Sequence, residues 1–188
     1  MDFKEKLESL LNDNMTERGF ALWKGIDQIL PSIWDKPTSS TGKYHKKING
    51  DIPSQAEHTY QMLYATVKLF KMFNIEEKTP DGDKLLIAIA LHDSLKYGNL
   101  GTRKYIDNFH DKNTANMIVQ NKEAFLKILT EEQFNVMEEV VRFHSGRWST
   151  DIEKGKSFSF EDYNPETLLV HTLDMMSTAD LIQTDVRD

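Results

Sequence analysis

Residues 85–98, "LLIAIALHDSLKYG", decide the fold class and raise the first question about function. The first seven residues of this stretch are apolar, a pattern typical of a helix that other elements cover on every side. His92 and Asp93 then stand where further leucines would be expected. An ionised carboxylate buried without a partner costs on the order of several kcal/mol, so Asp93 needs a compensating group. A divalent cation shared with His92 would supply it.

The length and composition fit one domain. A chain of 188 residues can bury a substantial core, and no boundary, repeat or low-complexity window divides it. The formal net charge of -7 argues against a protein that holds long nucleic acid by charge alone, because that binding needs many Lys and Arg contacts with phosphate. Short or monomeric nucleotides remain possible partners.

The absence of cysteine excludes disulfides, thiolate metal ligands and a cysteine nucleophile. A metal site in this chain therefore needs histidine and carboxylate ligands. The segment "MDFKEKLESLLNDN" at 1–14 is charged throughout and lacks the apolar core of a signal peptide, and nowhere do 18 apolar residues run together. We expect a cytoplasmic protein, in the host cytoplasm if a phage encodes it, with no membrane partner.

Helical periodicity recurs along the chain, whereas strand alternation is scarce. Helix-start signals precede three of the periodic segments, at Ser54, Thr130 and Asn164. We expect an all-α, single-domain bundle of about six to eight helices. Its site-bearing core spans about 54–182, the N-terminal helices of 1–31 pack on that core, and polar loops cover 37–53 and 149–163. The helices are expected near 2–12, 16–30, 54–73, 85–98, 113–129, 130–144 and 164–182.

Four of the six histidines stand near the ends of different expected helices. A single histidine on an apolar face is more often a hydrogen-bonded core residue than a ligand, but four helices of a bundle can direct such residues to one point. Nitrogen and oxygen ligands suit Zn, Mn, Fe, Co or Ni, and carboxylate-rich sites suit Mg. The four are His58, His92, His110 and His144, and His58 begins an inward stripe that continues with Met62, Ala65, Leu69 and Phe73.

The ordered segments "EHTYQM", "LHDSLKYG", "FHDKNTA", "VRFHSGRW" and "LVHTLDMMSTAD" resemble the HD-domain metal-dependent phosphohydrolase superfamily. The resemblance implies an HD-type helical bundle that binds one or two divalent metal ions. The implied ligands of the first ion are His58, His92, Asp93 and Asp174. In two-metal members His110 and His144 would hold a second ion with Asp93 as the bridge. The alternatives are substrate contact, as in one-metal members, or for His110 a purely structural place at the start of a helix.

Two further histidine and aspartate positions leave alternatives. Asp174 fits the late family pattern of an apolar run, His, two residues and Asp, whereas Asp180 lies nearly two turns further on. His171 stands three residues before Asp174, on a similar helical face. It either hydrogen-bonds near the site or packs in the core.

Polar and aromatic residues beside the ligands are candidates to contact substrate. Lys96 follows His92 by four residues, one helical turn, and the resemblance to the His-Asp-x-x-Lys variant of the family favours phosphate contact. Arg147 and Trp148 follow His144 directly; a guanidinium suits a phosphate group, and an indole suits stacking on a base. Their alternative roles are a solvated lysine and an ordinary loop with a packed tryptophan.

The loop "PTSSTGKYH" is not a P-loop, since Pro37 replaces the first required glycine and Tyr44 replaces the required Ser or Thr. Its Gly-Lys-Tyr-His end instead resembles some HD hydrolases, including an exonuclease-like branch. Ser40, Lys43 and His45 are therefore candidates to line the pocket.

The resemblance implies a hydrolase of phosphate esters or anhydrides that uses a metal-activated water. We expect a nucleotide substrate, and a (deoxy)nucleoside mono- or triphosphate fits best. Asp93 would position the nucleophile, while Lys96 and Arg147 would stabilise charge on the phosphoryl group. The alternatives are a phosphodiesterase or 3'-5' exonuclease acting on cyclic nucleotides or short oligonucleotides, and a non-catalytic nucleotide-sensing module. A homo-oligomer is possible.

Overall fold

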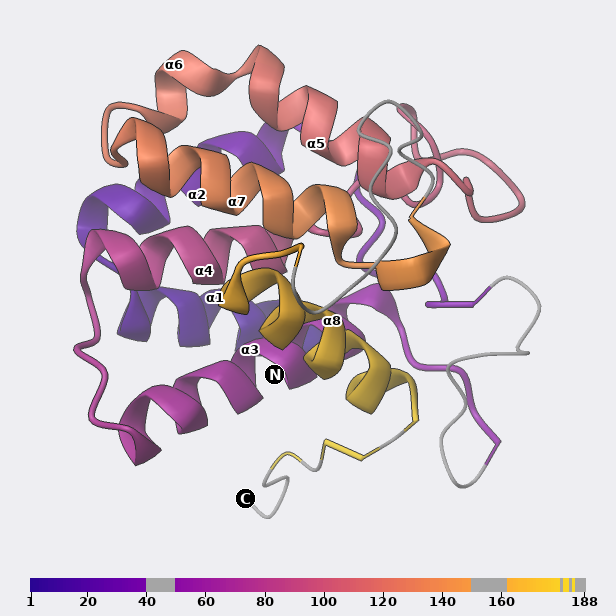
Figure 1. Cartoon of the computed structure of the whole chain (residues 1–188). Helices are drawn as coiled ribbons and strands as arrows, with labels where there is room; N and C mark the ends of the chain where they lie inside the picture. Colours follow the sequence, from indigo (N-terminus) through magenta and orange to yellow (C-terminus); the bar gives the residue numbers. More distant parts are fainter. Residues whose placement is uncertain (40–49, 150–161, 180, 183, 185–188) are drawn as a thin grey trace.

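The computed structural model describes residues 1–39, 50–149, 162–179, 181, 182 and 184, and this part of the chain is helical (Figure 1). Within these residues the only β pairing is an isolated bridge between Pro37 and Ser54. The expected all-α class is confirmed. The helices are α1 (Phe3–Asn14), α2 (Glu17–Ile29), α3 (Gln55–Met72), α4 (Pro80–Leu91), α5 (His110–Gln120), α6 (Lys122–Phe125), α7 (Glu131–Phe143), the 3-10 turn η1 (Gly146–Trp148) and α8 (Pro165–Thr178).

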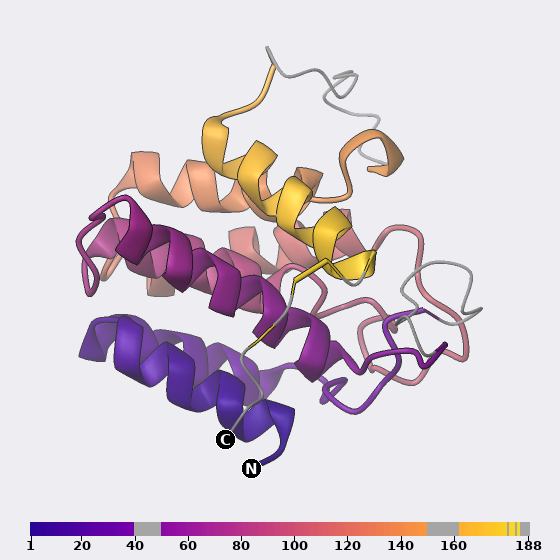
Figure 2. The same cartoon turned by 90° about the horizontal axis from the view of Figure 1, so that it is seen from below.

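Helix α4 is the central element of the bundle. It packs against α2, α3 and α7, and each of its residues from Gly82 to Leu91 is buried. In Figure 1, α5 and α7 lie on one side of α4, α1 and α3 lie on the other, and α8 crosses in front. Figure 2 shows the same layers from below, with α3 between α1 and α8. The apolar run that the sequence analysis began with therefore forms the buried centre.

The two N-terminal helices pack on this centre. Helix α1 lies against α3, and α2 lies against α4 with Trp23 fully buried. At the start of α2, the backbone N–H of Thr16 donates to Oδ1 of Asp83 at 2.9 Å, and the Thr16 hydroxyl donates to Oδ2. This contact joins α2 to the first turn of α4. We propose that residues 1–31 belong to the same domain as the site-bearing helices.

The three expected helix starts are confirmed. The side chains of Ser54, Thr130 and Asn164 each accept a hydrogen bond from the backbone N–H three residues later. Such caps satisfy donors that have no partner within the helix. None of the described helices has both the length and the apolar composition needed to cross a membrane.

Three expectations about the helices were wrong in detail. Helix α4 ends at Leu91, and His92 to Gly98 form tight turns held by i to i+3 hydrogen bonds, among them Lys96 N–H to Asp93 O at 2.9 Å. The segment expected as one helix over 113–129 begins at His110 and breaks at Asn121. Phe73, expected to face inward, is 66% exposed because it caps the end of α3, and Phe70 is buried instead.

Candidate metal centre and active site

Five elements bring their ends together around Asp93. His92 and Asp93 follow the last residue of α4, His144 follows α7, and His110 is the first residue of α5. His58 lies in the first turn of α3, and Asp174 lies in the second half of α8. Because these residues sit at or near helix ends, short side chains from separate helices reach one point. His58, His92, Asp93 and His144 are each at most 4% exposed.

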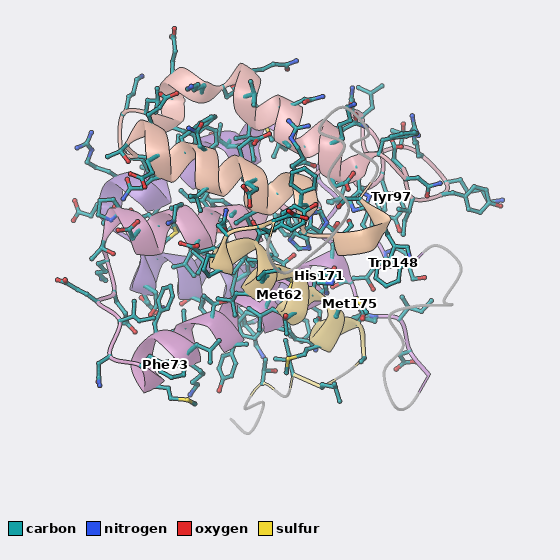
Figure 3. All side chains as sticks on the ribbon, in the orientation of Figure 1. Met62, Phe73, Tyr97, Trp148, His171 and Met175 are labelled. Atoms are coloured by element: carbon teal, nitrogen blue, oxygen red, sulfur yellow. The ribbon has the colours of Figure 1, made fainter. Side chains whose placement is uncertain are left out.

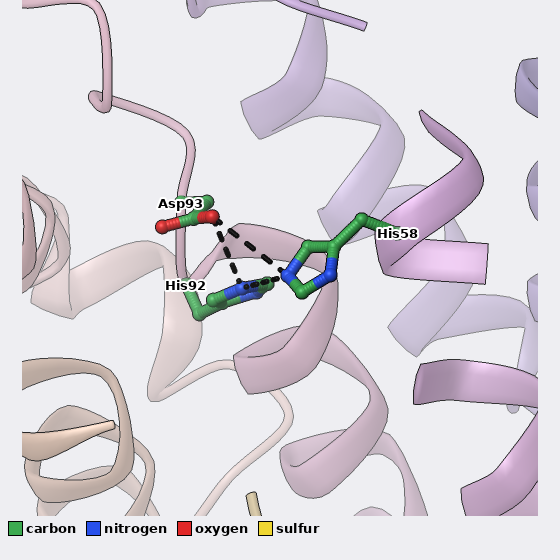
Figure 4. A group of neighbouring side chains, drawn as sticks. All are labelled: His58, His92 and Asp93. Atoms are coloured by element: carbon green, nitrogen blue, oxygen red, sulfur yellow. Dashed lines mark hydrogen bonds and ion pairs between the residues drawn. The ribbon is translucent and has the colours of Figure 1, made fainter. Parts of the chain in front are cut away.

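One half of the cluster joins His58 of α3 to His92 and Asp93 after α4 (Figure 4), and Asp174 of α8 lies beside it. The Nε2 atom of His58 is 3.2 Å from Nε2 of His92 and 3.2 Å from Oδ1 of Asp174. The Oδ2 atom of Asp93 is 3.4 Å from Nε2 of His92 and 3.9 Å from Nε2 of His58. His58, His92 and Asp93 thus offer converging ligand atoms that could hold a metal ion.

The other half of the cluster faces the second carboxylate oxygen of Asp93. Oδ1 is 3.1 Å from Nε2 of His110 and 3.6 Å from Nε2 of His144. These three residues form a second group that could hold an ion. The Oδ1 atom is buried, and no donor among the described residues hydrogen-bonds to it. Each carboxylate oxygen of Asp93 therefore faces a different pair of histidines: Oδ2 faces His58 and His92, and Oδ1 faces His110 and His144.

Three of the cluster histidines share a ring orientation that turns Nε2 toward the cluster. The Nδ1 atoms of His92, His110 and His144 lie 2.7, 2.8 and 2.7 Å from the backbone carbonyls of Ile89, Asp107 and Val141. A carbonyl can only accept, so Nδ1 carries the hydrogen and the Nε2 lone pair faces the cluster in the neutral ring. This is the arrangement that holds histidine ligands in metal sites.

His58 reaches the same tautomer through side chains. Its Nδ1 lies 2.9 Å from Oγ of Ser177, and that hydroxyl donates to Oε1 of Gln61 at 2.8 Å. With its hydrogen given to Gln61, Ser177 accepts from His58 Nδ1–H. Lone pairs of four imidazoles and oxygens of Asp93 then face one another, which is unfavourable unless a cation lies between them. The residues fit a divalent metal ion.

The pKa shifts of His58, Asp93 and Asp174 favour the protonation states that bind a metal ion. Burial lowers the pKa of the His58 imidazole. Burial alone would raise the pKa of Asp93, but the charges of Lys96 and His92 hold it well below its ordinary value. Burial is likewise outweighed at Asp174, where the His58 imidazole, 3.2 Å away, lowers the pKa of the carboxyl. Anionic carboxylates and a neutral imidazole are the forms that bind metal.

The pKa of His92 shifts in the opposite direction to that of His58. Burial would lower the pKa of His92, yet the charge and hydrogen bond of Asp93, with help from Asp174, raise it. The raised pKa reflects how strongly the two carboxylates attract positive charge to this position.

A family comparison agrees with the geometry. The family model described as "HD domain" matches residues 56–181, which include all six clustered side chains. The chain belongs to the HD domain family. Members of this family are in general metal-dependent phosphohydrolases, so the coarse activity expected from the sequence follows from membership. Comparisons with curated proteins and with solved structures found no match.

The six clustered residues (His58, His92, Asp93, His110, His144 and Asp174) are called the HD cluster. Four of them, Asp93, His110, His144 and Asp174, line a cavity of about 320 Å³. Lys96 is buried there, with its Nζ atom 2.5 Å from Oδ2 of Asp93. Trp148 is 52% exposed on the turn after α7, and Figure 3 shows it on the same side of the molecule as Met175 of α8. The full lining is Thr38, Ser39, Asp93, Lys96, Ile106, His110, His144, Ser145, Trp148, Asp174, Met175 and Thr178. A larger hollow of about 470 Å³ between α1 and α3 contains none of the HD cluster residues.

The residues singled out from the sequence divide into two groups. The six candidate ligands come together, and Lys96 and Trp148 line the HD cavity. Ser40, Lys43 and His45 lie outside the described residues, as does the side chain of Arg147.

Sequence reasoning missed several residues that support the HD cluster. Gln55 donates from Nε2 to Oδ2 of Asp93 at 3.3 Å, and Gln61 and Ser177 orient His58. Gln55 precedes His58 by three residues and Ser177 follows Asp174 by three, so helical spacing from the ligands was the available signal.

Proposed function

We propose that this HD protein is a nucleotide phosphohydrolase, acting on a (deoxy)nucleoside mono- or triphosphate. The observation that carries the proposal is the position of Asp93. Its two carboxylate oxygens face separate histidine pairs at the floor of a cavity that also holds Lys96 and Trp148. Acidic and imidazole ligands, a buried cation and an aromatic ring together suit a phosphate joined to a base.

The ligand assignment follows the two halves of the cluster. His58, His92, Asp93 and Asp174 would hold one ion, and Asp93, His110 and His144 would hold a second. These nitrogen and oxygen donors suit Mn, Co, Fe, Ni or Zn, and Mg where carboxylates dominate. Bound divalent ions would supply an activated water nucleophile and would polarise the phosphoryl oxygen.

The side chains around the ligands have separate tasks. Asp93 accepts hydrogen bonds and orients the attacking water toward the phosphorus. Lys96 brings a buried positive charge next to that carboxylate, where it can offset charge that develops on the phosphoryl oxygens. Trp148, Ile106 and Met175 give the cavity an apolar wall, and an indole stacks favourably on a base.

The cavity size bears on the kind of substrate. Its volume of about 320 Å³ lies at the low end of small-molecule sites, which span roughly 300 to 1,000 Å³. A site of this size suits one nucleotide better than several residues of a strand. We therefore rank a mononucleotide above the alternative substrates of a phosphodiesterase or 3'-5' exonuclease.

The test begins with metal analysis of the purified protein, followed by a screen for release of phosphate, pyrophosphate and triphosphate from nucleotides with Mn²⁺, Co²⁺ or Mg²⁺. Asp93→Asn should lose both metal and turnover. Asp81→Asn is the control, because Asp81 is exposed at the opposite end of α4. Unchanged metal content and turnover in Asp93→Asn would overturn the proposal.

The same screen separates the alternatives. Stepwise shortening of a short RNA, with no action on mononucleotides, would favour the exonuclease. Nucleotide affinity without turnover under every metal tried would favour a sensing module.

A further inference from the structure

His171 contacts the HD cluster from outside the cavity. It lies on α8 three residues before Asp174, and it does not line the cavity. Its Nδ1 atom is 2.7 Å from the backbone carbonyl oxygen of His144. The carbonyl can only accept, so the imidazole donates. His171 therefore hydrogen-bonds to the main chain of a candidate ligand.

The hydrogen bond from His171 satisfies a backbone carbonyl oxygen at the end of α7. His144 caps the carboxyl end of α7 and is 1% exposed. The last carbonyl oxygens of a helix receive no hydrogen bond from an N–H group of the same helix. Leaving such an oxygen buried and without a donor is unfavourable. The ring of His144 is fixed in turn by its own donation to Val141 O, which aims Nε2 at Asp93. Fixing the His144 backbone therefore fixes the direction of that nitrogen.

The next turn is built around the His171 ring. Gly146 has a φ of +59°, a left-handed conformation that favours glycine, and a Cβ atom there would overlap the imidazole of His171. The turn continues through hydrogen bonds from Trp148 N–H to Ser145 O at 3.2 Å and from Ser149 N–H to Gly146 O at 2.9 Å. The ring thus lies against the segment that carries Trp148 to the cavity, and Figure 3 shows His171 on α8 beside that turn.

Other contacts hold α8 in place. At its start, Asn164 donates from its backbone and side chain to Oε1 of Glu139 on α7, at 3.0 and 2.9 Å. Near its end, Ser177 hydrogen-bonds to His58 and Gln61 on α3. The hydrogen bond of His171 is therefore not what docks the helix.

We propose that His171 is a positioning residue that sets the His144 ligand and the Trp148 turn, and thereby couples α8 to the second metal position. The inference rests on the proposed function, because that function assigns His110, His144 and Asp93 to an ion. Loss of the donor should weaken the second position and leave the first, at His58 and His92, nearly unchanged.

The test compares two substitutions at one position. His171→Leu removes the N–H donor and leaves an apolar side chain of similar bulk. His171→Asn retains an N–H donor at the δ position. Thr172→Val is the control, since Thr172 is exposed on α8 and bonds only to Leu168 O among the contacts described for it. Calorimetric titration of the metal-stripped proteins with Co²⁺ reports each site separately.

The expected result is two Co²⁺ sites in the wild type. His171→Leu should weaken the second by about 10-fold to 100-fold, the usual effect of losing a hydrogen bond that supports a ligand, and change the first by less than about threefold. His171→Asn should restore most of the lost affinity, and Thr172→Val should match the wild type. Equal affinities in the wild type and His171→Leu, or equal weakening of both sites, would overturn the proposal.

A metal-independent measurement separates this inference from the proposed function. In metal-free protein labelled with ¹⁵N-histidine, the ring signals of His144 should shift in His171→Leu and return in His171→Asn. If the wild type bound no metal, the proposed function would fail, and these signals alone would decide the positioning role. Gly146→Ala, which displaces the His171 ring, should shift the same signals, so the test does not depend on the folding of one variant.

Discussion

The ammonium group of Lys96 lies 2.5 Å from Oδ2 of Asp93, the carboxylate oxygen that also faces His58 and His92. Both side chains are buried, at 5% and 4% exposure, and both line the cavity. A buried carboxylate surrounded by lone pairs is stabilised by such a cation, and a substrate phosphate would compete for the same ammonium. Lys96 therefore compensates Asp93, and under the proposed function it would also contact the substrate phosphate.

Replacing Lys96 by Met should separate binding of metal from turnover. Met keeps much of the apolar stem and removes the charge, so we expect kcat to fall by about 100-fold, as when one charge-stabilising donor is lost, with metal content retained. Lys84→Met is the matched control, because Lys84 is also buried and pairs with Glu166 at 3.0 Å, but does not line the cavity. Metal loss in step with activity would assign Lys96 to the integrity of the cluster instead.

The two halves of the cluster should lose metal independently. His58→Ala is expected to remove the ion between α3, α4 and α8, and His110→Ala the ion on the Oδ1 side of Asp93, because each variant leaves the other half intact. Asp93→Asn should affect both. Metal content per protein, measured by mass spectrometry after dialysis, checks this. A fall to zero in both histidine variants would indicate a single shared ion.

Trp148 should contribute to substrate affinity more than to chemistry. Stacking of a base on an aromatic side chain is worth roughly 1 to 3 kcal/mol, so Trp148→Ala is expected to raise KM by about 5-fold to 150-fold. Trp148→Phe retains a ring and should lie near the wild type. Steady-state kinetics on the best nucleotide from the screen measures both. A fall in kcat at constant KM would argue against a stacking role.

The clustering of the candidate ligands could be predicted because it depends on local order in the chain. Cluster histidines stand in the first turns of α3 and α5 and directly after α4 and α7, so the bundle brings them together once the helices pack. The supporting residues carry a weaker signal, which is only their helical spacing from the candidate ligands. Ser177 and Gln61 are separated by 116 positions, and only the crossing of α3 and α8 joins them. A hydroxyl and an amide on helices look like ordinary surface residues in a sequence.

The end of α4 shows a second limit of the sequence. Helical spacing placed Lys96 one turn after His92, but the chain leaves the α-helix at Leu91 and continues in tight turns that finish at Gly98, with a φ of +77°. Lys96 reaches Asp93 through this turn. Nothing in "HDSLKYG" terminates a helix before the glycine, so tertiary packing, not local propensity, decides the end.

Asp83 should make stability depend on pH in an unusual direction for a carboxylate. Burial raises its pKa above the ordinary value of 3.8, and the hydrogen bonds from Thr16 only partly oppose this. A raised folded-state pKa means that the folded protein binds the proton more tightly than the unfolded chain does. The contribution to stability is therefore fully present below 3.8 and is lost as the pH rises through the folded-state value.

The variant Asp83→Asn tests this sign. Asn can accept from Thr16 N–H and donate to the Thr16 hydroxyl, but it has no proton to lose. The free energy of unfolding of the variant, relative to the wild type, should increase between about pH 3.5 and pH 7, as measured by urea denaturation. Effects of the other carboxylates cancel in the difference. A relative stability that falls over this interval would contradict the raised pKa.

Two glycines of α2 should respond to alanine with opposite signs. A Cβ at Gly19 would overlap the carboxylate of Asp83, whereas nothing lies within 4 Å of the Cβ position at Gly25, which is exposed. We expect Gly19→Ala to destabilise by about 1 to 3 kcal/mol, since it forces Asp83 away from Thr16. Gly25→Ala should stabilise by about 0.5 to 1 kcal/mol, because alanine loses less backbone entropy on folding.

Urea denaturation of the two variants gives both free energies, and helix propensity alone predicts the same sign for both. A double variant identifies the cause of the difference. If the carboxylate is what Gly19→Ala displaces, then Gly19→Ala should cost less in an Asp83→Ala background than in the wild type, because the overlapping group is gone. Additive effects would show that Asp83 moves aside freely and that the contact between α2 and α4 does not depend on Gly19.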